Sequence, residues 1–192
     1  MDSIRIFGYK SFKKLSVQLH PINLLIGANG AGKSNFLSLF EMLGNIYEKR
    51  LGAYVAQVGG VDKLLYQGRK VTDRIAVNLL IAKSEYDLAL LEADGKLIVE
   101  REVVGCYDDV CPLDLVRKNV ITEYQNESSL KDHKEEDLSN YISQIRKFHF
   151  HDTGRRSPFT ADSHIVNDAY RMYEHGENLA AILYRIQREK PM

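Results

Sequence analysis

The chain has 192 residues, of which 44% are hydrophobic and 27% are charged, a composition typical of a globular protein. Its 26 basic residues balance its 26 acidic ones, so net charge does not argue for a nucleic-acid partner. No apolar window approaches the roughly 18 residues of a membrane span, no signal peptide opens the chain, and Cys106 and Cys111 are too few for a disulfide framework, so we expect a cytoplasmic protein with no membrane partner.

The first predicted elements are strands. SIRIFGY alternates, with Ile4 and Ile6 on one face and Arg5 on the other, and KKLSVQLH repeats the pattern. The continuous apolar run INLLI (22–26) predicts a third strand, covered on both faces.

The middle of the chain predicts one helix and an antiparallel meander. KSNFLSLFEMLGNIYEKR has the apolar spacing of an amphipathic helix, and a loop with a short helix is expected through VGGVDKLLYQGRK. Residues 71–104 contain three strands, RIAVNLLIA, YDLALLEA and KLIVEREVV. Asp94 and Gly95 predict a two-residue hairpin turn between the last two, because Gly tolerates the positive φ that the turn requires.

The remaining segments are less regular in pattern. Residues 105–127 are expected to be irregular, and the charge run KDHKEED (131–137) to be a solvated helix face leading into LSNYISQIRK. KFHFHDTG predicts a short strand ending at Asp152, followed by the loop RRSPFTADSH. GENLAAILYRIQRE predicts a final helix with Leu179, Ile182, Leu183 and Ile186 on one side.

A glycine loop, Gly27–Ser34, joins the third predicted strand to the first helix and matches G-x-x-x-x-G-K-[ST], the Walker A pattern. Glycines let successive N–H groups point at phosphate oxygens, and the helix that follows adds its own N–H groups and dipole. Lys33 can reach the β- and γ-phosphates of ATP, and the Ser34 hydroxyl can coordinate Mg²⁺. The candidate nucleotide-binding residues in and beside the loop are Asn29, Gly30, Ala31, Gly32, Lys33, Ser34 and Asn35.

IGANGAGKSNFL resembles the Walker A of ABC-type ATPases of the SMC, RecF and DNA-repair kind, usually GPNGSGKSN, and IRIFGYKSFKKLSVQL resembles their opening hairpin. GGVDKLLYQGRKVTD, KFHFHDT and GENLAAILYRIQRE resemble segments of a family of bacterial predicted AAA/ABC-type ATPases. The resemblance implies a mixed α/β P-loop fold and a single partial ATPase domain, 1–192. Its parts would be residues 1–50 with the P-loop, the β-lobe 71–104, and residues 127–192.

Two motifs of that family are absent from the sequence. There is no LSDGT-like signature, and no Walker B strand of four apolar residues followed by Asp-Glu. The resemblance then implies the N-terminal lobe of such an ATPase with an incomplete core sheet. We expect this lobe to bind Mg-ATP and to hydrolyse it little or not at all alone, which leaves open whether the chain is itself an enzyme. An exposed apolar sheet edge favours self-association or a partner chain, and DNA is possible for the full-length form.

Five further residues are candidates with open alternatives. The resemblance places Lys10 and Ser11 near the base or ribose, whereas a solvated turn is the alternative. His149, His151 and Asp152 could share a metal on one strand face, or could simply pack and form hydrogen bonds. The preferred interpretation gives Asp152 a Q-loop-like role near Mg²⁺.

Two other functions compete with ATP binding. The chain could be a non-catalytic interaction lobe whose P-loop is vestigial, which the missing Walker B motif favours. It could also be a small-molecule P-loop kinase, but the antiparallel meander argues against that class.

Overall fold

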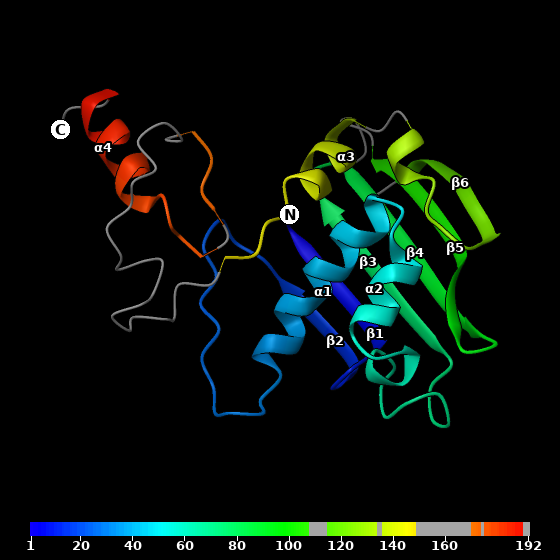
Figure 1. Cartoon of the computed structure of the whole chain (residues 1–192). Coiled ribbons are helices and arrows are strands. Elements are labelled where there is room, and N and C mark those ends of the chain that lie inside the picture. The colour runs from blue at the N-terminus through cyan, green and yellow to red at the C-terminus, as the bar shows by residue number, and fades with distance from the viewer. Residues whose placement is uncertain (108–114, 134–135, 149–169, 174, 190–192) are drawn as a thin grey trace. The chain divides into compact units, whose positions relative to one another are not determined.

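The computed structural model describes residues 1–107, 115–133, 136–148, 170–173 and 175–189. The chain divides into two compact units, Met1–Ile145 and Arg146–Met192. In the first unit, one face of a six-stranded sheet is covered by helices α1, α2 and α3 (Figure 1). The elements in chain order are β1 (Ser3–Tyr9), β2 (Phe12–Gln18), α1 (Lys33–Tyr47), α2 (Leu51–Gln57), η1 (Val61–Lys63), β3 (Arg74–Ile81), β4 (Ser84–Ala93), β5 (Lys96–Tyr107), β6 (Leu115–Gln125), η2 (Leu130–Asp132), α3 (Glu136–Ser143) and, in the second unit, α4 (Leu179–Glu189).

All neighbouring strands of the sheet are antiparallel, in the order β2-β1-β3-β4-β5-β6. The predicted opening hairpin and the three-stranded meander are confirmed, with Ile4 and Ile6 buried and Arg5 exposed. Asp94 (φ 50°) and Gly95 (φ 78°) form the predicted turn between β4 and β5. Alternating burial along β3 and β4 turns one face of the sheet toward the helices.

The prediction of irregular structure for 105–127 is wrong. β5 continues to Tyr107, and β6 forms an eleven-residue edge strand on it. The sequence LVRKNVITEYQ shows no clean alternation of apolar and polar residues. Two of its apolar side chains, Val120 and Tyr124, are exposed on this edge strand. Backbone pairing with β5, which the residue pattern does not encode, defines this strand.

The prediction of a buried strand for the apolar run 22–26 is also wrong. In these residues no regular element forms, and Ile22, Leu24 and Ile26 are 90%, 81% and 84% exposed. The run lies in the long irregular segment between β2 and α1 (Figure 1). A strand covered on both faces needs neighbours to bond its backbone, and no described strand pairs with this run.

The helices follow the predictions more closely. α1 begins at Lys33, inside the predicted range, and buries an apolar stripe that includes Leu39, Met42 and Leu43. A short helix was expected in VGGVDKLLYQGRK, but this segment contains only the 3₁₀ turn η1. The short helix α2 lies directly before it. The charge run is only partly helical, because η2 includes Lys131 and Asp132 and α3 begins at Glu136.

The last predicted elements lie in the second unit. α4 is confirmed, although Ile182 is the residue that it buries, while Leu183 and Ile186 are about half exposed. Lys147 and Phe148 are not in a strand, and the rest of KFHFHDTG and the loop after it lie outside the described residues. No described helix is long and apolar enough to cross a membrane.

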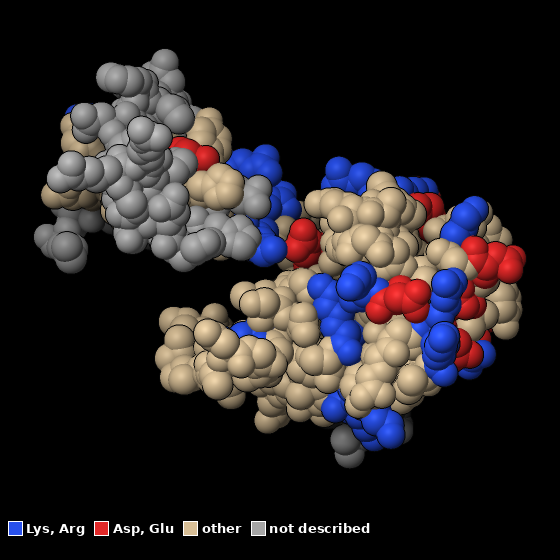
Figure 2. Space-filling view, turned by 60° about the horizontal axis from the view of Figure 1, so that its bottom comes forward, with Lys and Arg blue, Asp and Glu red and all other residues tan. Residues whose placement is uncertain are grey.

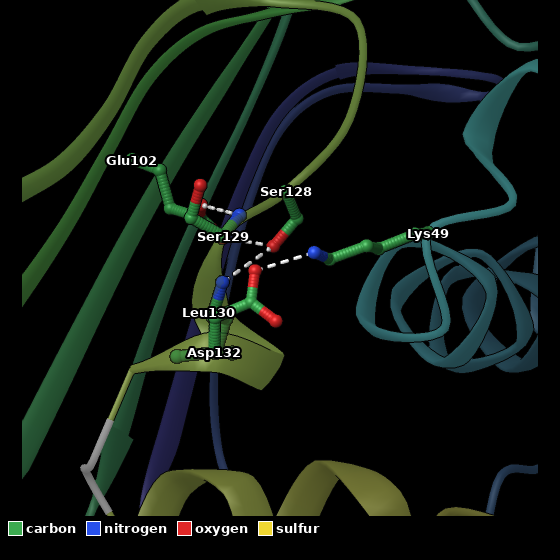
Figure 3. A network of polar contacts seen from close by, with 6 residues as sticks. All are labelled: Lys49, Glu102, Ser128, Ser129, Leu130 and Asp132. Atoms are coloured by element: carbon green, nitrogen blue, oxygen red, sulfur yellow. Dashed lines mark hydrogen bonds and ion pairs between the residues drawn. The ribbon is translucent and has the colours of Figure 1, made fainter.

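A carboxylate is buried inside the first unit. Glu102 of β5 is fully buried and accepts hydrogen bonds from Ser128 Oγ (2.5 Å) and Ser129 N (2.9 Å) (Figure 3). It also accepts a hydrogen bond from Tyr86 Oη at 2.5 Å. Burial, then the neighbouring Glu102, raises the pKa of Tyr86 well above its usual value. Three donors compensate for the desolvation of the carboxylate and fix the chain after β6 onto the sheet.

The same segment is tied to the end of α1. Asp132 pairs with Lys49 (Figure 3), and Lys131 pairs with Glu48 at 2.6 Å. Because these pairs are substantially exposed, each contributes little stability, and the buried contacts of Glu102 are the stronger attachment.

Candidate functional site

The glycine loop, Gly27–Ser34, leads directly into α1. Gly30 (φ 84°) and Gly32 (φ 94°) adopt left-handed conformations, which glycine tolerates without a Cβ clash. A tight turn closes within the loop, where Ala31 N donates to Ala28 O at 3.2 Å. Asn29, Gly30 and Ala31 are exposed. The loop is therefore a curled, accessible stretch of backbone.

The start of α1 offers hydrogen-bond donors to an anion. No side chain caps the helix at Gly32, and its first turn contains no acidic residue. The first helical bond runs from Phe36 N to Gly32 O at 2.9 Å, so the N–H groups before Phe36 have no partner in the helix ladder. These donors and the positive end of the helix dipole fit a phosphate group.

Lys33 brings a positive charge to the same loop. Its Nζ donates to the carbonyl oxygens of Gly27 (2.6 Å) and Ala28 (2.8 Å), so the ammonium lies against the loop. A phosphate oxygen is a stronger acceptor for an ammonium than a neutral carbonyl. The adjacent Ser34 is exposed, and its hydroxyl oxygen is a suitable ligand for Mg²⁺.

The turn of the opening hairpin packs against the glycine loop. Asn35 Nδ2 donates to Ser11 Oγ at 2.9 Å. A Cβ at position 32 would lie 3.1 Å from Ser11 Oγ and 3.2 Å from the Phe12 ring, so a residue other than glycine would need these neighbours to shift. The structure thus brings Ser11 together with two of the predicted loop residues, Gly32 and Asn35.

Lys10 reaches α1 one turn further on, where it joins a polar cluster. Lys10 Nζ donates to Ser38 Oγ at 2.8 Å, and Ser38 Oγ lies 2.9 Å from Tyr9 Oη and donates to Asn35 O at 2.8 Å. Tyr54 Oη donates to Ser38 O at 3.2 Å. Burial raises the pKa of Tyr9 and of Tyr54.

The sequence predictions missed the role of Ser38 in this cluster. Its signal was a serine within the apolar stripe of α1, beside Leu39, where a hydroxyl needs hydrogen-bond partners. The cluster fixes the second turn of α1, and with it the direction in which the first turn presents its N–H groups.

The remaining predicted site residues are not brought to the glycine loop by the described structure. His149, His151 and Asp152 lie outside the described residues. Within the described ranges, no group of three His, Cys, Asp or Glu side chains could hold a metal ion. Cys106 lies half-buried in β5, and Cys111 lies outside the described ranges.

Two comparisons with known proteins bear on this site. The model of a protein family described as AAA ATPase domain matches residues 1–178, which include the glycine loop and all described strands. No match was found among curated proteins.

Proposed function

The chain belongs to the AAA ATPase domain family, and from that membership we propose that it binds Mg-ATP through the Gly27–Ser34 loop. The observation that carries the proposal is the uncapped start of α1 beside the Lys33 ammonium. Uncapped N–H groups, a positive dipole end and an ammonium together suit the negative charge of a polyphosphate.

The roles of the individual residues follow from their positions. Lys33 pairs with the β- and γ-phosphates, and the Ser34 hydroxyl holds Mg²⁺, which neutralises phosphate charge when it is bound. Asn29 is exposed in the loop, and we propose that it contacts the γ-phosphate. Ser11 and Lys10 act on the first two turns of α1 through Asn35 and Ser38.

Hydrolysis by this chain alone is expected to be slow or absent. The sequence contains no apolar strand followed by Asp-Glu, which would hold Mg²⁺ and position the attacking water. We propose Asp152 as a Q-loop-like residue that assists Mg²⁺ in a complete ATPase of the SMC/RecF-like kind. If Asp152→Ala, made in a form of this protein that hydrolyses ATP, left the turnover of ATP and its dependence on Mg²⁺ unchanged, that role would be rejected.

The exposed apolar run 22–26 supports a further part of the proposal. Its side chains at Ile22, Leu24 and Ile26 are more than four-fifths exposed, and the backbone is not paired with any described strand. We propose that a second copy or a partner chain covers this run. The alternative, a purely structural interaction lobe with a vestigial P-loop, rests on the same run and differs in predicting no nucleotide binding.

A calorimetric titration of Mg-ATP into the full chain tests the proposed function. Saturable binding is expected, with a loss of at least tenfold in affinity for Lys33→Ala, because a charge-assisted contact to phosphate is removed. Lys49→Ala, at the opposite end of the same helix, is the matched control and should bind like the unmodified chain. No binding by the unmodified chain, or equal loss in both variants, would favour the interaction lobe.

A further inference from the structure

The six-stranded sheet has an open face on the side away from α1, α2 and α3 (Figure 1). Successive side chains of a strand point to opposite faces, so the residues next to the buried Ile6, Val77 and Leu88 point to this open face. A hollow of about 520 Å³ lies there and crosses five strands, β2, β1, β3, β4 and β5. Neither the Gly27–Ser34 loop nor the apolar run 22–26 lines it.

The floor of the hollow is one row of residues that lie opposite one another across the strands. Ala76 and Ala89 form the middle of the row and have no side chain beyond Cβ, whereas their neighbours Phe7 and Arg101 are long. The row is therefore a depression with an apolar floor. A cation lies at each end, and the strands of these two cations are four inter-strand spacings apart, about 19 Å. In order from β2 to β5 the row is Lys14, Phe7, Ala76, Ala89 and Arg101.

A second row of residues forms one side of the hollow and is mostly polar. Its acidic side chain, Asp87, accepts a hydrogen bond from Asn78 Nδ2 at 2.5 Å. Of the charged side chains that line the hollow, three are basic and one is acidic, so positive charge predominates. From β2 to β5 this row is Ser16, Arg5, Asn78, Asp87 and Val103.

The cations of the hollow are free to bind a further anion. Lys14 and Arg5 are exposed, and neither forms an ion pair with another residue that the structure describes. Arg101 Nε lies 3.9 Å from Glu123 Oε1, and both side chains are more than half exposed, so a ligand carboxylate can replace this long pair at little cost. Figure 2 shows that several other Lys and Arg side chains of the first unit adjoin Asp or Glu side chains, which compensate their charge.

We propose that this hollow binds an acidic peptide segment of a partner protein, with one large apolar side chain of the segment on the floor formed by Ala76 and Ala89. Carboxylates of the segment complement Lys14 and Arg5 at one end and Arg101 at the other. An extended chain rises roughly 3.3 Å per residue, so about six residues span the floor row. The expected segment thus has acidic residues about five positions apart, with a Leu, Phe or Trp between them.

The apolar floor favours a peptide over a nucleic acid. A nucleic-acid backbone supplies phosphate and sugar groups, and neither gains from burial against alanine side chains and the Phe7 ring. A peptide supplies both carboxylates and an apolar side chain. The proposal does not rest on nucleotide binding, because the hollow shares no residue with the Gly27–Ser34 loop.

Selection of a phage-displayed library of random 12-residue peptides against the full chain tests the proposal. We expect the selected peptides to share the acidic–apolar–acidic spacing. Fluorescence polarisation with a labelled selected peptide then measures affinity. Lys14→Glu should lose at least about tenfold, because it places a like charge against the peptide. Lys13→Glu is the matched control, since the same change on the same strand points to the opposite face, and it should bind the peptide like the unmodified chain.

A second pair of variants tests the floor. Ala89→Trp should fill the depression and lose at least about tenfold in peptide affinity, because the apolar side chain is displaced from the floor. Ala53→Trp, on the exposed side of α2, adds the same side chain elsewhere and should bind normally. Circular dichroism checks that both variants fold, and Lys14→Glu tests the hollow independently of them.

Several outcomes would overturn the proposal. They are the selection of no binding peptide, selected peptides without acidic residues, equal loss in Lys14→Glu and Lys13→Glu, and displacement of the peptide by polyglutamate or duplex DNA as readily as by the unlabelled peptide. Lys33→Ala should keep full peptide affinity, and Lys14→Glu should keep its affinity for Mg-ATP. A failure of nucleotide binding with intact peptide binding would count against the proposed function alone.

Discussion

Asn35 Nδ2 donates a hydrogen bond to Ser11 Oγ, and the two residues join the first turn of α1 to the turn of the opening hairpin. Gly32 lies against the same turn, so the N-terminal end of the helix cannot move without disturbing β1 and β2. The six-stranded sheet therefore acts as the rigid support on which the glycine loop is mounted.

A double-mutant cycle on Ser11→Ala and Asn35→Ala should measure this connection. We expect a coupling free energy of about 0.5–1.5 kcal/mol in urea unfolding, the range of one hydrogen bond between neutral groups. Affinity for Mg-ATP should fall in each single variant, but less than in Lys33→Ala. Strictly additive effects on stability would show that the contact does not form in solution.

Ser38→Ala should destabilise the first unit by about 1–3 kcal/mol, because Tyr9 and Lys10 lose a buried partner. Ser16→Ala on the exposed side of β2 is the control, with an expected change within about 0.5 kcal/mol. Thermal or urea unfolding followed by circular dichroism measures both. Equal small effects would mean that water replaces the Ser38 hydroxyl.

Gly8→Ala and Gly52→Ala should change stability in opposite directions. At Gly8 (φ 71°) a Cβ would lie 2.1 Å from the Arg74 carbonyl oxygen, so we expect a loss of about 1–3 kcal/mol or more. At Gly52, inside α2, a Cβ would meet no atom within 4 Å, and alanine should stabilise by about 0.5–1 kcal/mol. A stable Gly8→Ala variant would contradict the close approach of β1 and Arg74.

Stability should fall at high pH because of buried tyrosines. The pKa of Tyr86 is raised in the folded chain, whereas in the unfolded chain it stays near 10. The contribution of Tyr86 to the free energy of unfolding therefore does not change with pH below pH 10. Above pH 10 the unfolded chain alone loses the proton, which lowers the free energy of unfolding by about 1.4 kcal/mol per pH unit. Urea unfolding between pH 8 and 11 should show a shallower decline for Tyr86→Phe, and parallel curves would refute it.

Self-association should depend on the apolar run 22–26. Sedimentation velocity over a range of concentrations is expected to show oligomers of the unmodified chain. The double variant Leu24→Lys, Ile26→Lys should shift it toward monomer, because two charges oppose burial of the run. Val120→Lys, an exposed apolar position on β6, is the control and should leave the distribution unchanged. A monomer at all concentrations would count against a second copy as the partner.

The sequence predicted those features whose causes are local. The Asp94–Gly95 turn, the alternation of Ile4 and Ile6 and the start of α1 at Lys33 each depend on residues close in the chain. Backbone pairing is not encoded in the residue pattern, and so β6 was missed although it pairs with β5, the strand directly before it. The apolar run 22–26 was misassigned for the same reason, since a strand needs a neighbouring backbone as well as apolar side chains.

In the candidate site too, the sequence predicted the local features and missed those that depend on packing. Glycine spacing identified the loop, and Lys33 does lie against it. The contact of Tyr9 with Ser38 joins residues 29 positions apart in the sequence, and no local pattern predicts it. Only the packing of α1 on β1 brings these two hydroxyls together.

The strand order also has a consequence for the rate of folding. Among the described strands, each pairs with its successor in the chain except β2. Its successor β3 pairs instead with β1, and the segment between β1 and β3 includes β2, α1 and α2. Short-range pairing is fast, whereas closing so long a segment carries an entropic cost that slows it. We expect pulse-labelled hydrogen exchange to protect β3, β4 and β5 first. The amides of α1 and its glycine loop would then be protected only when β1 closes onto β3, which makes the phosphate site one of the last parts of the first unit to form.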